Sequence, residues 1–264
     1  MTASRSLVTD VVVLVASIVC LLHFNELLPP LPSFLPPLQS MQSMIPFLRV
    51  PSVDKSTLDN NSDQTRIVKE GWQLASSSSD ITLYNKDMGG PALSVRGVGI
   101  VDCPFSILMT TFFDISQSKK WVADLHSVEE HDYNKKTHDG TLLQRYRVAG
   151  GLVVKDREFL LRRKIKRNKR KGTITVSYES YEDDKRFPVC DGCVRSWSDL
   201  TQWVFTKMEG GRTKVDLQAV LDPKGSLSPI LVNLHQKSWP KTSIMALKNV
   251  ATKRNKDSGE FSKW

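Results

Sequence analysis

The length and composition of this chain exclude a generally disordered protein and a small disulfide-held scaffold. Its 264 residues are 40% hydrophobic, which is enough for a packed core in one large domain or two small ones. Four cysteines are too few to hold such a length together. A formal net charge of +9 suits nucleic acid, an anionic membrane or an acidic partner, and does not choose among them.

An apolar segment lies near the N-terminus, over residues 7–24. Its uninterrupted part, Val11 to Leu22, has the length of a signal-peptide core, and its flanks bring it near the length of a membrane span. No small-residue cleavage site follows closely. We therefore predict that residues 1–24 form an uncleaved signal anchor, with a cleaved signal peptide or a buried helix as the alternatives. This predicts a single-pass endomembrane protein, or a protein of the secretory pathway if the segment is cleaved.

The next segment, residues 25–65, is predicted to be a linker. Its first part is rich in proline, leucine and methionine, and prolines prevent a continuing helix. Its second part, residues 52–65, is polar and typical of a flexible connection. A folded domain over residues 66–255 and a polar tail over residues 256–264 complete the predicted organisation.

The first half of this domain mixes short helices with two strands. Pro104 favours the first turn of a helix, with Asp102 or Cys103 at its cap. The predicted helices span residues 67–75, 105–114 and 117–123, and the predicted strands span residues 81–84 and 93–101.

The second half alternates with a period of two, which is typical of strands with one buried face. The strands are predicted over residues 141–148, 158–166, 173–181, 194–205 and 212–221, with a turn at residues 169–172. Helical spacing then returns over residues 230–237 and 242–251, and Pro240 is expected to break or kink the chain between them. The fold class is therefore α+β, with a long antiparallel sheet closed by a C-terminal amphipathic helix.

Four motifs in this order resemble those of the START (steroidogenic acute regulatory protein-related lipid transfer) domain family. They are KKWVAD at residues 119–124, VKDREF at 154–159, CVR at 193–195 and LDPKGSLSP at 221–229. They span much of the domain, and their order agrees with the order of the predicted elements.

The resemblance implies a helix-grip fold, in which a curved sheet wraps around the C-terminal helix and encloses an apolar cavity. It also implies non-enzymatic binding of a single lipid, a phospholipid or a sterol, for transfer between membranes or for sensing. No cofactor is expected. One alternative is an enzyme of the wider helix-grip superfamily acting on a hydrophobic ligand, and another is a membrane-anchored interaction protein with a vestigial cavity.

Arg163 is the most informative candidate for contact with the ligand. It shares a strand face with Phe159, Leu161 and Ile165, and a buried arginine is costly unless it is paired. Some relatives are expected to carry an acidic partner on the preceding strand, where this chain has Gln144. Arg163 is therefore predicted to meet an anionic or zwitterionic headgroup, with Gln144 and Tyr146 nearby. The alternative is a structural ion pair with a carboxylate such as Asp199.

Other candidates line the predicted cavity or its lid. Aromatic side chains could form its wall or cage a choline group, although such residues are more often simply core. The wall candidates are Tyr178, Trp197, Trp203 and Leu217, and the resemblance implies a lid helix carrying Ile230, Leu234, Ile244 and Leu247.

A basic hairpin is the candidate membrane-docking surface. It carries Lys166, Arg167, Lys169, Arg170 and Lys171. Aromatic residues are not interleaved with these charges and no nucleic-acid motif accompanies them, so no nucleic-acid partner is predicted. The remaining readings are a patch for anionic lipid and a solvated charged turn.

Cys190 and Cys193 form a CxxC motif. A zinc site requires further ligands, and the next histidine downstream is His235, so no metal is predicted. Two free thiols, or one disulfide in an oxidising compartment, remain the two readings.

Overall fold

The computed structural model describes residues 61–88, 93–148, 154–225 and 229–258. The predicted signal anchor and most of the predicted linker lie outside these residues. Within the described ranges, no helix combines the length and the apolar character needed to cross a bilayer.

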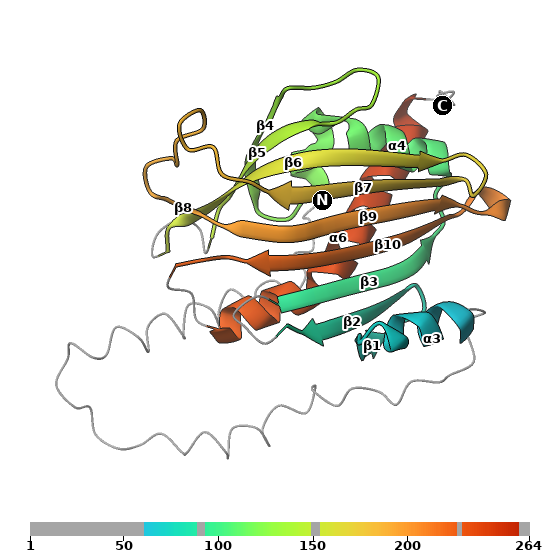
Figure 1. The fold of residues 1–264 in the computed structure, drawn as a ribbon. Helices are drawn as coiled ribbons and strands as arrows, with labels where there is room; N and C mark the ends of the chain where they lie inside the picture. Colours follow the sequence, from blue (N-terminus) through green and yellow to red (C-terminus); the bar gives the residue numbers. More distant parts are fainter. Residues whose placement is uncertain (1–60, 89–92, 149–153, 226–228, 259–264) are drawn as a thin grey trace, which may run out of the picture. The chain divides into compact units, whose positions relative to one another are not determined.

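One sheet organises the described residues, and it is antiparallel, as predicted, except where β8 pairs with β6 (Figure 1). Its strand order is β1-β2-β3-β10-β9-β7-β6-β5-β4, and β8 pairs with β6 outside this path. The strands are β1 (Gln73–Ser77), β2 (Ile81–Asp87), β3 (Leu93–Val101), β4 (Leu125–His131), β5 (Gly140–Tyr146), β6 (Asp156–Asn168), β7 (Thr173–Ser180), β8 (Cys193–Arg195), β9 (Trp197–Lys207) and β10 (Thr213–Asp222).

Two departures from the predicted strands matter for the site. First, β4 was not assigned a range from the sequence, yet it forms one edge of the sheet beside β5. Second, the single strand expected over residues 194–205 is divided at Ser196 into β8 and β9. The backbone N–H of Ser196 donates to the Glu158 carbonyl, and its hydroxyl donates to the Pro223 carbonyl. These bonds turn the chain from parallel pairing with β6 to antiparallel pairing with β10.

The helices are α3 (Asn61–Lys69), α4 (Phe105–Phe113), α5 (Ser118–Trp121) and α6 (Pro229–Ser258), with 3-10 turns at Ile115–Gln117 (η2) and Glu209–Gly211 (η4). The helix predicted over residues 67–75 is wrong in position, because α3 begins within the predicted linker and ends before Gly71. That glycine has a φ of +86°, a typical helix stop. Pro104, rather than Asp102 or Cys103, is the N-cap residue of α4.

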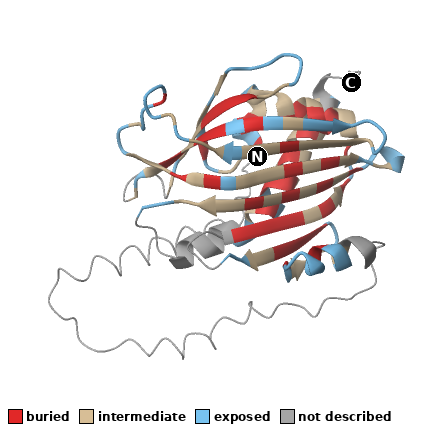
Figure 2. Cartoon of the chain, in the orientation of Figure 1, coloured by how far each residue is buried: buried red, intermediate tan, exposed pale blue. Residues whose placement is uncertain are grey.

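The C-terminal helix α6 crosses one face of the sheet, which we call the inner face (Figure 1). It continues through Pro240, so the break expected there is not observed, and it also extends into the predicted tail. Side chains at helical spacing on one side of α6 are buried: Pro240, Ile244, Leu247 and Ala251. Buried residues of α6, α4 and the central strands meet in one apolar cluster (Figure 2).

Gly97 on β3 allows α6 to approach the sheet. A Cβ atom at this position would lie 2.8 Å from Cβ of Pro240 and 3.4 Å from Cδ1 of Ile244. The first distance is shorter than van der Waals contact, so any larger residue must displace the helix.

We expect Gly97→Val to lower the free energy of unfolding by about 1–3 kcal/mol, the usual cost of overpacking. Chemical denaturation measures this loss, and Gly97→Ala should give a smaller one. A Gly97→Val protein as stable as the wild type would contradict the close approach of α6.

Candidate functional site

The inner face carries a small polar cluster among apolar side chains, which we call the inner polar cluster. It consists of Glu130, Gln144, Tyr146, Arg163 and Tyr178. Strand register places these residues together, because β5 pairs with β4 and β6, and β6 pairs with β7. Arg163 lies directly opposite Gly140 on one side and Tyr178 on the other.

Arg163 has a carboxylate partner, and it is Glu130 on β4. Its terminal nitrogen forms an ion pair with Oε1 of Glu130, and its Nε donates to the carbonyl of His138 at 2.9 Å. Only 6% of the Arg163 side chain is exposed, against 24% for Glu130. Of the two readings of Arg163, the structure therefore shows the ion pair, although Asp199 is not the partner.

Gly140 makes this contact across β5 possible. It stands between Arg163 on β6 and the β4 edge, and a Cβ there would lie 3.7 Å from the Arg163 guanidinium and 3.2 Å from the His131 carbonyl. A larger side chain at this position would occupy the space through which Arg163 reaches the outer strand.

The remaining members of the inner polar cluster offer hydrogen-bonding groups without charge. The Tyr146 hydroxyl donates to Oε1 of Gln144 at 2.9 Å, and the Tyr146 ring packs edge-on against Phe159 at 5.6 Å between centroids. The Tyr178 hydroxyl interacts with the Arg163 guanidinium. With Glu130 balancing Arg163, the cluster has no net charge and presents hydroxyl and amide groups.

The other predicted wall residues lie elsewhere. Trp203 and Leu217 are 3% and 0% exposed and belong to the apolar cluster under α6 and α4. Trp197 was expected on the same face as Trp203, and this is wrong. The register skips Asp199, so that Trp197 pairs with Asp222 while Trp203 pairs with Leu217. Such a bulge moves a side chain to the opposite face, where the Trp197 indole donates to Asp199.

The structure describes the side chains of some lid candidates and of all the docking candidates. Ile244 and Leu247 are buried in the apolar cluster, whereas Ile230 and Leu234 lie in the first turns of α6, whose side chains are outside the described residues. The five basic docking candidates are all exposed, on the end of β6 and in the turn that leads to β7.

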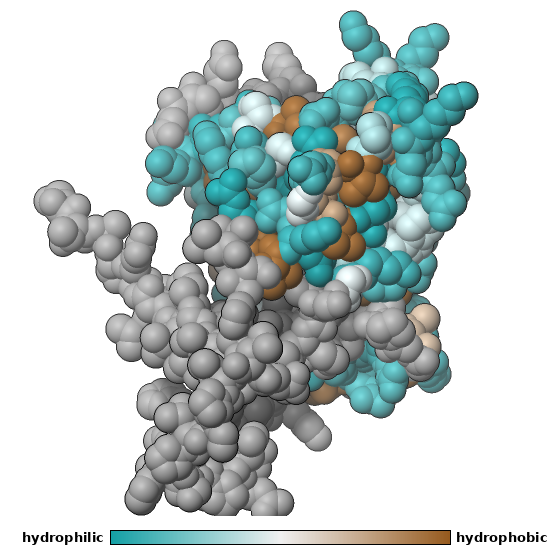
Figure 3. Space-filling model, turned by 90° about the vertical axis from the view of Figure 1, so that its left-hand side faces the viewer, coloured by the Kyte–Doolittle hydropathy of each residue, from teal (hydrophilic) through white to brown (hydrophobic). Residues whose placement is uncertain are grey.

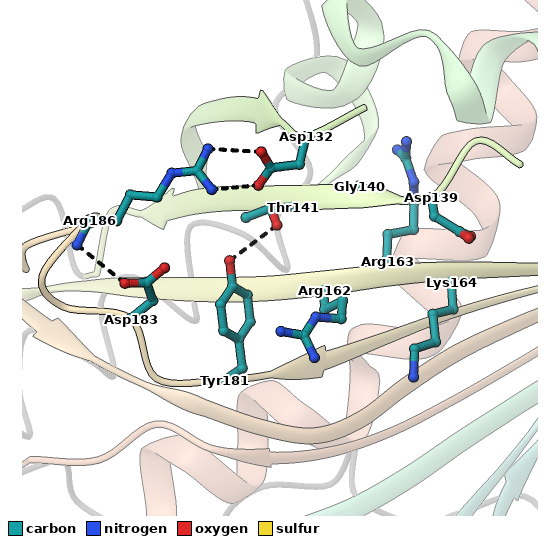
Figure 4. A pocket seen from close by; sticks show the side chains of 10 residues that line it. All are labelled: Asp132, Asp139, Gly140, Thr141, Arg162, Arg163, Lys164, Tyr181, Asp183 and Arg186. Carbon is teal, nitrogen blue, oxygen red and sulfur yellow. Dashed lines mark hydrogen bonds and ion pairs between the residues drawn. The ribbon is translucent and has the colours of Figure 1, made fainter. Parts of the chain in front are cut away.

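A pocket of about 370 Å³ opens beside β5 and β6. Arg186 and Asp132 form a two-pronged ion pair at 2.8 and 2.9 Å, and Tyr181 bonds to Thr141 at 3.1 Å (Figure 4). Arg163 points to the side of β6 opposite from Arg162 and Lys164 (Figure 4). The pocket's carboxylates and its tyrosine thus already have partners, which are the Arg186 side chain, the Thr141 hydroxyl and backbone N–H groups.

A second charged cluster lies on the outer face of the sheet, where Glu158 is 0% exposed. Its carboxylate accepts from Nε of Arg145 at 2.6 Å and contacts a terminal nitrogen of Arg195 at 2.9 Å. Cys190 and Cys193 are joined as a disulfide with Cα atoms 5.3 Å apart. A Glu158 oxygen and both sulfurs lie within 4.8 Å of one another.

Burial raises the pKa of Tyr178 to about 12 and raises that of Tyr146 as well. Because the folded-state pKa exceeds the ordinary value near 10, the buried neutral hydroxyl contributes stability that is complete below about pH 10. This contribution is lost as the pH rises toward 12.

We therefore expect unfolding in denaturant to become easier between about pH 10 and pH 12. Tyr178→Phe should reduce this dependence. Tyr133→Phe, which changes an exposed ring, should leave it intact. Equal pH dependence in wild type and Tyr178→Phe would contradict the assignment.

The sequence did not reveal Glu130. It belongs to β4, an edge strand without a continuous apolar face, and its alternation with Val128 was the available signal. Register with β5, which pairs Glu130 with Leu142 and Val128 with Gln144, identifies the inward residues once the strand is known.

Comparison with known proteins gives one family and one fold. A family model described as START domain matches residues 53–243. The fold is similar to that of human STARD10, with a TM-score of 0.63 at 18% identity over 81% of this chain and 86% of that one. It is also similar to human StAR-related lipid transfer protein 5, with a TM-score of 0.64 at 16% identity over 73% and 91%. The fold is also similar to that of a STAR-related lipid transfer protein from Xanthomonas axonopodis, with a TM-score of 0.58 at 20% identity over 69% of this chain and 99% of that one. No curated protein sequence matches the chain.

Proposed function

Because the chain belongs to the START domain family, we propose that it binds one lipid between the inner face of its sheet and α6, without chemical change to the lipid. The observation that carries this proposal is a polar cluster without net charge on the same sheet face as the apolar cluster under α6 and α4. Such a combination suits a molecule with a long apolar body and a small polar end.

The charge balance of the inner polar cluster supports a class of headgroup. Glu130 already neutralises Arg163, so a purely anionic group would have to compete with a carboxylate in contact with the guanidinium. A zwitterionic headgroup or a hydroxyl can instead accept from the side-chain amide N–H of Gln144, and a hydroxyl can also donate to a tyrosine oxygen. We propose a sterol or a zwitterionic phospholipid as the ligand.

Mass spectrometry of lipids bound to residues 57–264 tests this proposal. These residues form one compact unit and omit the apolar N-terminal segment, which would itself retain lipid. The expected result is one lipid per chain, enriched in sterol or zwitterionic species relative to the membranes of the source cells. Absence of any stoichiometric lipid would overturn the binding role, and a lipid recovered in altered form would favour the enzyme alternative.

We also propose that the exposed basic hairpin docks the domain on anionic membranes, where lipid enters or leaves. Each basic residue near such a surface contributes about 1 kcal/mol. Replacing Lys169 and Lys171 by Ala should therefore weaken binding to phosphatidylserine vesicles by about 30-fold at low salt.

Co-sedimentation of residues 57–264 with vesicles measures the effect. The control is Lys119→Ala with Lys120→Ala, which removes the same charge from exposed positions on α5. Equal losses in both pairs would indicate a general charge effect and would contradict docking through the hairpin.

A proposal for the N-terminal segment remains separate. We propose that residues 1–24 tether the domain to an endomembrane, on the strength of their apolar run. Alkaline extraction of membranes from cells that produce the full chain tests it, because a tethered protein stays in the pellet.

A further inference from the structure

The disulfide between Cys190 and Cys193 lies in the loop that precedes β8, at the surface of the domain. Both cysteines are half-buried, and Asp191 and Gly192 between them are exposed. The end of the molecule near β8 is largely hydrophilic (Figures 1 and 3). An external thiol can therefore approach the bond from water.

This disulfide contributes little to the stability of the fold. The stabilisation that a crosslink gives by restricting the unfolded chain grows with the length of the loop it closes, and here the sequence separation is three. The disulfide also adjoins the strand pairing directly, since Cys193 pairs with Asp156 and the Asp156 N–H donates to the Gly192 carbonyl.

The surroundings of the two sulfurs suit reversible chemistry. The buried Glu158 carboxylate lies within 4.8 Å of both and can accept or return a proton as a thiol forms or ionises. Arg195 contacts this carboxylate, and its Nε and one terminal nitrogen are buried without a hydrogen-bond acceptor among the described residues. A guanidinium near a thiol favours the thiolate.

The loop is also connected to the segment that leads into α6. Arg157 donates to the carbonyls of Pro223 and Lys224 at 2.9 and 3.2 Å, and Ser196 donates to Pro223 at 2.7 Å. Arg157 pairs with Val194 of β8, so the strand that begins at Cys193 shares its contacts with residues 223–224. A change in the loop therefore reaches the chain just before the helix that covers the inner face.

We propose that Cys190 and Cys193 form a thiol–disulfide exchange site whose substrate is a dithiol, and that reduction loosens the hydrogen bonds of Arg157 and Ser196 to residues 223–224. A thiolate of the dithiol attacks one cysteine sulfur and forms a mixed disulfide. The Cys190–Cys193 bond breaks, and its electron pair leaves on the other sulfur, which takes a proton. The second thiol of the dithiol then resolves the mixed disulfide, so the protein gains two electrons and two protons and the dithiol becomes a disulfide. The effect on lipid exchange rests on the proposed function, whereas the exchange chemistry does not.

The full chain, in detergent, is titrated with dithiothreitol at neutral pH, and the cysteine peptides are alkylated and quantified by mass spectrometry. Cys190 and Cys193 should react together and reversibly, while the buried Cys103 stays protected. Hydrogen exchange over residues 193–196 and 222–225 should be about fivefold faster in the reduced protein, which corresponds to the loss of about one hydrogen bond. If Cys190 and Cys193 are reduced only after global unfolding, or if exchange over these residues is unchanged in the reduced form, the proposal is wrong.

Two variants test whether the effect of dithiothreitol depends on the disulfide and whether Glu158 takes part in the proton transfer. Cys190→Ser with Cys193→Ser should resemble the reduced wild type and ignore dithiothreitol, and the reduced, alkylated wild type provides the same comparison if the variant folds poorly. Glu158→Gln leaves Arg145 and Arg195 without their buried counter-charge and should lower stability, so circular dichroism first checks that the oxidised variant is folded. In the folded variant the pH dependence of the reduction rate should change, and an unchanged pH profile would exclude Glu158 from the proton transfer. A chain that binds no lipid but shows the redox-dependent hydrogen exchange would overturn the proposed function alone.

Discussion

Replacing Glu130 by Gln is expected to lower the free energy of unfolding by about 3 kcal/mol. The change leaves the guanidinium of Arg163 buried without a counter-charge, and removing one member of a buried pair is costly. The expected value is at the lower end of the usual range because about a quarter of the Glu130 side chain is exposed. Urea denaturation of residues 57–264 measures it.

A neighbouring residue provides the matched control. Glu129 is nearly half exposed and contacts Arg145 and His131 at the surface, so Glu129→Gln should cost less than about 1 kcal/mol. Adding Arg163→Met to Glu130→Gln should recover part of the loss, because removing both charges leaves no unpaired group. Similar losses from Glu129→Gln and Glu130→Gln would contradict the importance of the buried pair.

The same variant tests the proposed headgroup class. In Glu130→Gln the guanidinium becomes available for a lipid phosphate, which arginine binds with two parallel hydrogen bonds. Lipids bound by this variant should shift toward anionic phospholipids, and addition of such a lipid should restore part of its stability. An unchanged lipid profile would show that Arg163 does not face the ligand.

The sequence predicted the architecture well for a physical reason. Strand alternation and the amphipathic C-terminal helix are local patterns, and the buried face of each strand follows from them. Alternation within the strands predicts that Arg163, Tyr178 and Gln144 lie on buried faces. The pairing of β5 with β6 and of β6 with β7 brings all three together in the inner polar cluster.

What the sequence missed depends on non-local pairing. The partner of Arg163 lies two strands away in the sheet, and its identity required knowing that Gly140 leaves a gap between β6 and β4. The bulge at Asp199 is likewise invisible to a strict period of two, since it is defined by the extra residue relative to β10. Beyond such a bulge, a strict alternation along the sequence therefore assigns side chains to the wrong face of the sheet.

This bulge leads to the second prediction, in which two tryptophans of one strand should behave differently. Trp203 is 3% exposed, and its ring packs against those of Phe112, Trp121 and Phe205 at 5.4–5.7 Å between centroids. Trp203→Ala should therefore cost about 3–5 kcal/mol. Trp197 lies half-buried on the opposite face, and Trp197→Ala should cost about 1 kcal/mol, as for most substitutions outside a core.

Denaturation of lipid-loaded and lipid-stripped protein separates a structural role of Trp203 from contact with the ligand. If Trp203 stabilises only the packed core, its replacement costs the same in both forms, because ligand binding adds a constant term. If the indole also contacts the lipid, the loss is larger in the loaded form by the lost binding free energy. Equal, small losses from Trp203→Ala and Trp197→Ala in both forms would contradict the strand register, since the bulge would then not separate the two side chains.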